Sequence, residues 1–160
     1  MRVAAGLSVD GSGSAGQGTA EAGAQALAER VAAGMFARDP ASQALGMAIA
    51  AVGPGHATLT MTVRADMLNG HATCHGGFVF TLADSAFAFA CNSHNANTVA
   101  AGCSIEFLAA SREGDRLVAS ARERALAGRS GVYDVEIVNQ RGETVALFRG
   151  KSARIKGEVV

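Results

Sequence analysis

The stretch GGFVFTLADSAFAFACN, residues 76–92, decides the fold of this 160-residue chain. After its two glycines it is almost wholly apolar, and its length and alanine content favour a helix over a strand. A helix that is apolar on every face belongs inside a domain. We therefore predict a central buried helix, preceded by a loop over residues 65–77 that is dense in polar residues and glycine.

Toward the N-terminus, the pattern predicts an amphipathic helix over about residues 22–38. Leu27, Val31 and Met35 recur at four-residue intervals, which is helical spacing. The Asp39-Pro40 pair ends this helix, because the residue before a proline is disfavoured in the helical conformation.

Strand patterns account for most of the remaining chain. Leu45–Val52 and the alternating stretch His56–Arg64 are predicted to form a hairpin around the turn Gly53-Pro54-Gly55. Four more strands are expected in the second half of the chain: Thr98–Ala109, Asp115–Leu126, Gly131–Asn139 and Thr144–Ile155. Short turns separate successive strands, which favours antiparallel pairing. The predicted fold class is α+β, with one antiparallel sheet of about six strands and a hydrophobic helix against it.

The composition weighs against several classes of protein. The chain has 14 basic and 14 acidic residues, so it lacks the basic excess typical of a nucleic-acid binder. No stretch approaches the roughly 20 apolar residues of a membrane span, and the N-terminus does not have the pattern of a signal peptide. Three cysteines do not suggest a disulfide framework, so a reducing, cytoplasmic setting is expected.

The predicted domain organisation is one domain over residues 23–157, preceded by a tail over residues 1–22. The tail is rich in Gly, Ser and Ala, so it buries too little to offset the entropy of ordering it, and we expect it to be flexible. The single central helix covers only one face of the sheet. The other face or the edges are therefore expected to meet a partner subunit.

Asp84 is the first candidate for chemistry. It lies about eight residues into the apolar helix, too far along to cap the N-terminus. A buried carboxylate without partners is costly, so it either finds hydrogen-bond donors or its pKa rises. Thr81 and Ser85 could supply those donors, which would make Asp84 structural; otherwise it is a candidate catalytic group. The residues alone leave both interpretations open.

Gly76 and Gly77, at the start of the same helix, could let a ligand approach the backbone closely. Free N–H groups and the helix dipole favour negative charge at that end, where an oxyanion on a thioester carbonyl could be stabilised. The alternative is that the two glycines only make a tight turn.

The loop before the glycines carries His71, Cys74 and His75. These supply at most three ligands, and no fourth is evident nearby, which argues against a zinc site. Their spacing does not establish an activated thiolate at Cys74 either. His75 could orient the loop or hydrogen-bond a substrate, whereas Asn69, before Gly70, has the pattern of an ordinary turn residue.

Three cations, Arg149, Lys151 and Arg154, occur in the stretch FRGKSARI near the end of the chain. On a strand, Arg149 and Lys151 point to the same face. Such a group could bind phosphates, or it could be a solvated strand edge that resists aggregation.

The stretch LNGHATCHGGFVFTLADSAFAFACNS, residues 68–93, resembles the phenylacetate-degradation thioesterases (the PaaI type) of the hotdog superfamily. The resemblance continues in GCSIEFL, SGVYDVEIVNQ and VALFRGKSARI, and it covers roughly residues 45–155. The combination of NGH-x-TCHGG with an aspartate eight residues after the first glycine of the pair is specific.

The resemblance implies a hotdog fold, in which a curved antiparallel sheet wraps around the long helix. Two subunits would pair into a homodimer, dimers would form a homotetramer, and the active site would lie between subunits. Asp84 would act as general base or nucleophile, and the Gly76 N–H would bind the thioester carbonyl. His75 and Asn69 would help position substrate and water, with Asp84 facing the Asn69–Gly76 loop of the neighbouring subunit. No metal and no cofactor are implied, because coenzyme A is part of the substrate.

The implied activity is hydrolysis of phenylacetyl-CoA, or of a ring-hydroxylated phenylacetyl-CoA, to free CoA and the carboxylic acid in phenylacetate degradation. Arg149, Lys151 and Arg154 would contact the CoA phosphates. The main alternative is a non-catalytic acyl-CoA-binding domain of the same fold, against which Asp84 argues. A hotdog hydratase acting on enoyl-CoA is a second alternative, but no histidine follows Asp84 before His94.

Overall fold

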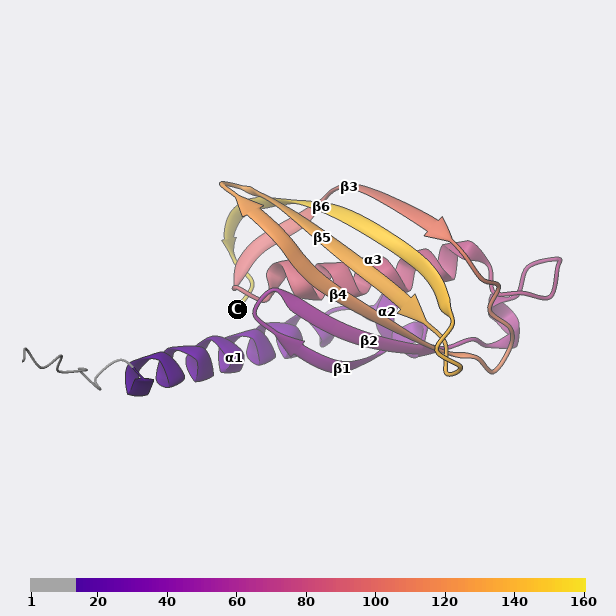
Figure 1. The fold of residues 1–160 in the computed structure, drawn as a ribbon, viewed down its shortest axis with the longest axis horizontal. Helices are drawn as coiled ribbons and strands as arrows, with labels where there is room; N and C mark the ends of the chain where they lie inside the picture. Colours follow the sequence, from indigo (N-terminus) through magenta and orange to yellow (C-terminus); the bar gives the residue numbers. More distant parts are fainter. Residues whose placement is uncertain (1–13) are drawn as a thin grey trace, which may run out of the picture.

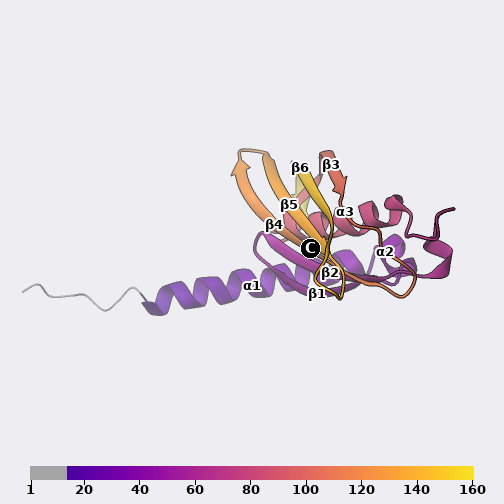
Figure 2. The ribbon, with the colours of Figure 1, turned by 45° about the vertical axis from the view of Figure 1, so that its right-hand side comes forward.

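The computed structural model describes residues 14–160, which form a six-stranded antiparallel sheet curved around one long helix (Figure 1). The strands are β1 (Ala48–Gly53), β2 (His56–Thr62), β3 (Ala96–Phe107), β4 (Arg116–Ala127), β5 (Ser130–Val138) and β6 (Thr144–Glu158). Their order in the sheet is β1-β2-β4-β5-β6-β3. The long helix α3 (Gly76–Asn92) lies under the sheet, as a view from another side also shows (Figure 2). The predicted α+β class and the six strands are confirmed.

Helix α3 is buried along most of its length, which confirms the prediction from its composition. Its buried apolar residues are Val79, Leu82, Ala83, Ala86, Phe87, Phe89, Ala90 and Cys91. The Phe87 ring packs against Tyr133 and Phe148, with ring centroids 5.5 and 5.9 Å away. Gly150 of β6 permits this contact, because a Cβ there would lie 2.9 Å from the Phe87 ring. Since burial of each large side chain contributes about 1.5–3 kcal/mol, α3 anchors the whole sheet.

The N-terminal helix begins earlier than predicted. Helix α1 spans Ser14–Phe36, so the predicted start at about residue 22 is wrong, and residues 14–22 of the expected tail are helical. This segment contains alanine, glutamine and glutamate, which favour helix, and it contains no proline. Its first turns extend beyond the sheet (Figure 1). Residues 1–13 lie outside the part of the chain that the structure describes.

The C-terminal half of α1 packs as the helical spacing predicts. Val31 is fully buried, and Leu27 and Met35 are half-buried. Helix α1 ends at Phe36, as expected from Asp39-Pro40, and a short helix α2 (Pro40–Ala44) follows. Asp39 caps α2, because its carboxylate accepts a hydrogen bond from the Ser42 N–H at 3.0 Å.

Strands β1 and β2 form the predicted hairpin. The register pairs Gly53 with His56, so Pro54 and Gly55 make a two-residue turn. Gly55 has a φ of +72°, a left-handed backbone conformation that would be strained in a residue with a side chain. Ala57, Leu59 and Met61 are buried on one face of β2, as their alternation predicts.

Strand β3 departs from the expected pairing of successive strands. It pairs with β6 at one edge of the sheet, whereas β4 pairs with β2. The connection over residues 108–115, which leads from β3 to β4, passes the start of α3, where the Ser111 carbonyl accepts a hydrogen bond from the Cys74 N–H at 2.8 Å. Within residues 14–160, β3 therefore has a strand on one side only.

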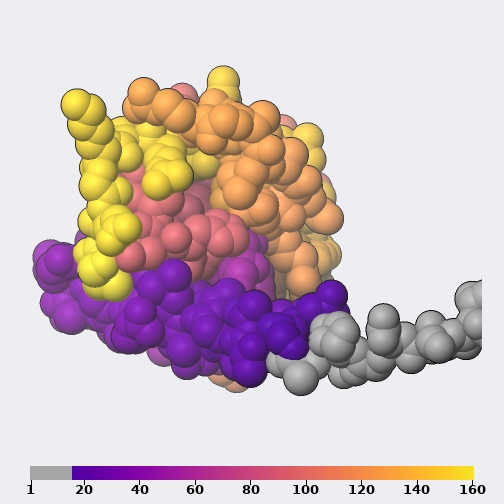
Figure 3. Space-filling view, turned by 90° about the vertical axis from the view of Figure 1, so that its left-hand side faces the viewer, coloured from indigo at the N-terminus to yellow at the C-terminus, as the bar shows by residue number. Residues whose placement is uncertain are grey.

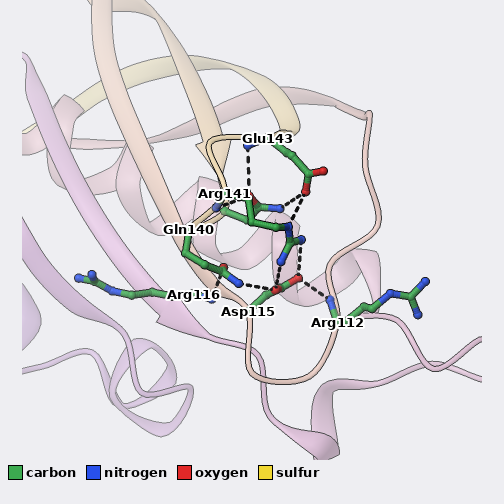
Figure 4. Close-up of polar contacts among 7 residues, drawn as sticks. Arg112, Asp115, Arg116, Gln140, Arg141 and Glu143 are labelled. Atoms are coloured by element: carbon green, nitrogen blue, oxygen red, sulfur yellow. Dashed lines mark hydrogen bonds and ion pairs between the residues drawn. The ribbon is translucent and has the colours of Figure 1, made fainter.

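A buried carboxylate holds this connection in place (Figure 4). Asp115 is only 4% exposed, and it accepts a hydrogen bond from the Arg112 N–H at 2.8 Å. The side chains of Gln140 and Arg141, in the turn before β6, each donate to it at 2.7 Å. These donors lower the pKa of Asp115 well below its usual range, with the Arg141 bond as the largest cause. The β3–β4 connection is thereby fixed to the β5–β6 turn.

Candidate active site

Asp84, on the third turn of α3, has no hydrogen-bond partner within residues 14–160. The Thr81 hydroxyl donates to the Gly77 carbonyl at 2.8 Å. The Ser85 hydroxyl lies 3.0 Å from the Ser42 hydroxyl. Both groups that could have satisfied Asp84 are engaged elsewhere, so the interpretation of Asp84 as a hydrogen-bonded structural residue does not hold.

Partial burial without donors raises the pKa of Asp84 above the ordinary aspartate value. A carboxylate in that state is more basic than a solvated one, and no cation among residues 14–160 forms an ion pair with it. It can therefore take a proton from water or attack an electrophile directly.

Asp84 opens into a cleft of about 610 Å³ between the helices, the start of β3 and the end of the chain. Its polar lining includes Arg38, Asn97, Thr98 and Glu158, and its apolar lining includes Met35, Phe87, Val99 and Val159. Figure 3 shows the end of the chain, in yellow, reaching down to the N-terminal helices, in indigo and purple. The Arg38 side chain joins these parts by donating to the Val159 carbonyl at 3.1 Å. The cleft has room for an acyl group with both polar and apolar surface.

The start of α3 is capped by His75. Its ring Nδ1 accepts a hydrogen bond from the Gly77 N–H at 2.9 Å, and the backbone N–H of His75 donates to the Met67 carbonyl at 2.8 Å. Because Nδ1 accepts, the neutral ring carries its proton on Nε2. The exposed His75 ring thus offers an N–H donor at the surface of the loop.

The Gly76 N–H has no hydrogen-bond partner within the described residues, and the first turn of a helix concentrates positive charge on such groups. Gly76 lines a second cavity of about 350 Å³ beneath Phe107. A Cβ at position 76 would lie 3.0 Å from the Phe107 ring, so this close approach favours glycine. The Gly76 N–H is thus a candidate donor to a carbonyl oxygen that enters the cavity.

Asn69 shapes the loop that leads to this helix. Its Oδ1 accepts hydrogen bonds from the His71 N–H at 2.9 Å and from the Thr73 hydroxyl at 3.2 Å. This is the turn role that its position before Gly70 predicts. Its Nδ2 has no partner among residues 14–160 and remains available as a donor.

One loop and the helix start that follows it carry Asn69, His75 and Gly76, whereas Asp84 lies two turns further along the helix. Eight residues separate Gly76 from Asp84, which is about 12 Å along a helix and about 80° around it. The two residues line different cavities.

Cys74 is not an activated nucleophile in this structure. It is buried, and burial raises the pKa of its thiol. Its Sγ points to the His75 carbonyl at 3.7 Å. Among residues 14–160 no three His, Cys, Asp or Glu side chains gather as metal ligands would.

The three cations of β6 are divided between the two faces of the strand. Arg149 forms two hydrogen bonds with Asp134, at 2.7 and 2.9 Å, and Asp134 also pairs with Arg124 at 2.9 Å, so one carboxylate is shared by two guanidinium groups. Lys151 shares its exposed face, as predicted, while Arg154 has the opposite parity and lines a small cavity with Cys91 and Tyr133. The expected cluster of three is therefore a pair plus a separate residue.

Sequence reasoning did not identify four residues that line the two cavities: Arg38, Asn97, Thr98 and Ser111. They come from a helix end, a strand start and a loop. None lies in a local motif, so only the tertiary structure brings them to the cavities.

Comparisons with known proteins agree with this geometry. Residues 71–146 match the family model described as the thioesterase superfamily. The acyl-coenzyme A thioesterase PaaI of Escherichia coli K12 is 53% identical over 125 residues, covering 78% of this chain and 89% of that protein. The structure of the E. coli PaaI protein from the phenylacetic acid degradation operon superposes with a TM-score of 0.83 and 51% identity, covering 84% and 97% of the two chains.

A more distant solved structure was determined with coenzyme A. It is a hypothetical thioesterase from Streptococcus pneumoniae TIGR4, 28% identical, with a TM-score of 0.67 over 70% of this chain and 90% of that chain. None of the helices in residues 14–160 is long and apolar enough to cross a membrane.

Proposed function

Because this chain belongs to the thioesterase superfamily and has the hotdog fold, we propose that it is an acyl-CoA thioesterase of phenylacetate degradation. Its proposed substrates are phenylacetyl-CoA and ring-hydroxylated phenylacetyl-CoA, which it hydrolyses to free CoA and the carboxylic acid. The observation that carries this proposal is Asp84, a half-buried carboxylate with a raised pKa and no partner within the described residues.

In the proposed reaction the thioester carbonyl accepts a hydrogen bond from the Gly76 N–H. That bond strengthens as negative charge develops on the oxygen. Asp84 either takes a proton from the attacking water or attacks the carbonyl carbon itself to form a mixed anhydride, which water then cleaves. In both routes the C–S bond breaks and the thiolate of CoA takes up a proton. His75 and Asn69 supply donors that position substrate and water.

We propose that the active site is completed between subunits of a homodimer, and that dimers assemble into a homotetramer. The separation of about 12 Å between Gly76 and Asp84 along one helix supports the first part. Strand β3 offers the surface for pairing, because its outer edge meets no strand of the described chain and carries Val99, 45% exposed, and Phe107, 53% exposed. An exposed apolar edge of this kind favours pairing with a second copy.

The proposed contacts for the CoA phosphates are Arg149 and Lys151 on the outer face of β6. Arg154, which is exposed on the opposite face of β6, is the proposed contact for a different phosphate of CoA. We also propose a cytoplasmic location, which is supported by the free thiols of Cys74, Cys91 and Cys103.

The test of the function is free-thiol release from phenylacetyl-CoA by the wild type and by Asp84→Asn. We expect the substitution to lower kcat about 1,000-fold or more, because it removes the base or nucleophile without changing side-chain size. Equal rates would reject Asp84 as the catalytic group. Tight binding of phenylacetyl-CoA with no thiol release by the wild type would instead identify a non-catalytic binding domain.

Mixing two inactive variants tests the shared site. Gly76→Pro removes the N–H at the first helical position, where proline fits the backbone because His75 before it is extended. Its Cβ would lie 3.0 Å from the Phe107 ring, and that ring, 53% exposed, has room to shift. A heterodimer of Gly76→Pro and Asp84→Asn has one intact site if the site is shared between subunits. We expect a mixture to regain about a quarter of wild-type activity after subunit exchange. No recovery, with exchange shown by mass spectrometry, would place both residues in one subunit's site.

A further inference from the structure

Ser111 carries the single buried side-chain polar atom without a hydrogen-bond partner in residues 14–160. The residue is 2% exposed. The hydroxyl of a buried serine is normally paired, because an unpaired polar group in a protein interior destabilises the fold. A group kept in this state calls for an explanation in terms of function.

Ser111 lines the cavity at the start of α3 that Gly76 also lines. The rest of the lining is mainly apolar and includes Val79, Phe107, Leu108 and Val145. Two residues of the lining thus carry a polar group without a partner in the described chain, the Gly76 N–H and the Ser111 hydroxyl, and the hydroxyl is covered in the side-chain rotamer of this structure. The cavity volume of about 350 Å³ suits a narrow chain with one or two carbonyl or amide groups.

The main chain around Ser111 is fixed, and its side chain is not. The Ser111 carbonyl accepts from the Cys74 N–H at 2.8 Å, and the N–H groups of Leu108 and Ala109 both donate to the Val145 carbonyl. Arg112, the next residue, is held by Asp115. Rotation about the Cα–Cβ bond of Ser111 moves its hydroxyl among three staggered positions and breaks no hydrogen bond inside the described chain.

We propose that the Ser111 hydroxyl binds the secondary amide nearest the sulfur in the pantetheine arm of the acyl-CoA substrate. This inference rests on the proposed thioesterase function and adds a substrate-binding residue to it. The thioester carbonyl reaches the Gly76 N–H, and the amide two carbons beyond the sulfur lies along the same cavity. That amide loses water when it enters the apolar cavity, and a hydroxyl can either donate to its carbonyl or accept from its N–H.

The test compares three thioesters of phenylacetic acid: the CoA ester, the N-acetylcysteamine ester, which keeps the amide, and the S-ethyl ester, which lacks it. Ser111→Ala is expected to raise KM about 3- to 10-fold for the first two esters and to leave KM for the S-ethyl ester unchanged. The Tm of the free protein should stay the same or rise by up to about 3 °C, because an unpaired buried hydroxyl is removed.

Ser93→Ala is the matched control. Ser93 is equally buried, but its hydroxyl donates to the Ala90 carbonyl and accepts from the Gly55 N–H, both at 2.8 Å. We expect this variant to lose several degrees of Tm and to keep wild-type KM for all three esters.

The outcomes separate this inference from the proposed function. A wild type that hydrolyses none of the esters overturns both. A wild type that hydrolyses the CoA ester, together with a Ser111→Ala variant whose KM is unchanged or rises equally for the S-ethyl ester, overturns only the role of Ser111. A fall in Tm equal to that of Ser93→Ala overturns it too, since the hydroxyl would then have a partner inside the protein.

Discussion

Asp84 and Asp115 carry the same carboxylate in opposite surroundings. Asp84 is half-buried beside a cleft with no donor in the described chain, and its pKa is raised. Asp115 is almost fully buried, accepts four hydrogen bonds, and has a lowered pKa. The difference separates two tasks: Asp115 stabilises the folded chain, whereas Asp84 keeps its charge unneutralised and available for reaction.

The two regions are also connected in space. Asp115 ends the β3–β4 connection, which carries Ser111 to the start of α3, beside Gly76. The satisfied carboxylate therefore holds the loop that lines the cavity for the substrate. This loop must be stably folded for the Gly76 N–H and the Ser111 hydroxyl to bind the substrate.

The largest expected contrast comes from removing each carboxylate. Asp115→Ala should lower the free energy of unfolding by about 3 kcal/mol, because Arg141, Gln140 and the Arg112 N–H lose their shared acceptor. Asp84→Asn should leave the free energy of unfolding unchanged or raise it, because a carboxylate without donors is replaced by a neutral amide. Urea denaturation of both variants measures the contrast.

Measuring kcat of the same two variants separates the loss of a reacting group from a loss of folding. Asp115→Ala, assayed at a temperature where it is folded, should lose far less kcat than Asp84→Asn, because it loosens a loop of the cavity but removes no reacting group. Equal losses of stability in the two variants would contradict the assignment of separate tasks.

The second contrast is in the pH dependence of stability. Asp115 has a lowered pKa, so the unfolded chain binds its proton first, and stability from Asp115 is lost as the pH falls below about 3.9. Asp84 has a raised pKa, so the folded chain holds that proton to higher pH, and stability falls as the pH rises from about 3.9 through the raised value. Unfolding of wild type, Asp84→Asn and Asp115→Asn between pH 3 and pH 6 should show slopes of opposite sign for the two sites.

The acidic limb of kcat/KM should follow the same raised pKa. Hydrolysis requires ionised Asp84, so the limb is expected at a higher pH than a solvated aspartate would give. A limb at or below pH 3.9 would show that the ionisation of Asp84 does not control the rate.

The smallest expected effect is at Thr81, which lies about one helical turn before Asp84 on α3. Its hydroxyl donates to the Gly77 carbonyl rather than to Asp84. Thr81→Val, which keeps the shape and removes the hydroxyl, should change kcat by less than about twofold. A tenfold loss in a steady-state assay would mean that Thr81 holds Asp84 in the assembled enzyme.

Local patterns predicted most of the secondary structure, because the spacing of apolar residues in α3 and β2 matches the residues that are buried. They did not predict where α1 begins, since residues 16–22 are exposed and no apolar face marks this part of the helix. They also did not predict the place of β3. Strand order depends on which edges are free after α3 packs, and spacing along the chain does not contain that information.

The candidate site was predictable only in part. Asp84 was identified because a charge in an apolar helix is unusual, but its lack of partners depends on where the Thr81 and Ser85 hydroxyls point. Arg154 appeared to join Arg149 and Lys151 until strand parity placed it on the other face. Ser111 could not be found from sequence, because its unpaired state is a property of the packed loop.

The position of β3 has a consequence for how the chain folds during synthesis. Strand β3 precedes β4, yet its ladder forms with β6, which pairs Phe107 with Ala146 and Ala96 with Glu158. A growing chain that has left the ribosome only as far as the β5–β6 turn contains α3 and β3 but not the strand that joins β3 to the sheet. The strand that pairs with β3 is therefore the last to be synthesised, and this pairing is long-range, which slows folding relative to local pairing. Until β6 emerges, the apolar surface of α3 lacks part of its cover, and this interval is when the chain is most prone to aggregate.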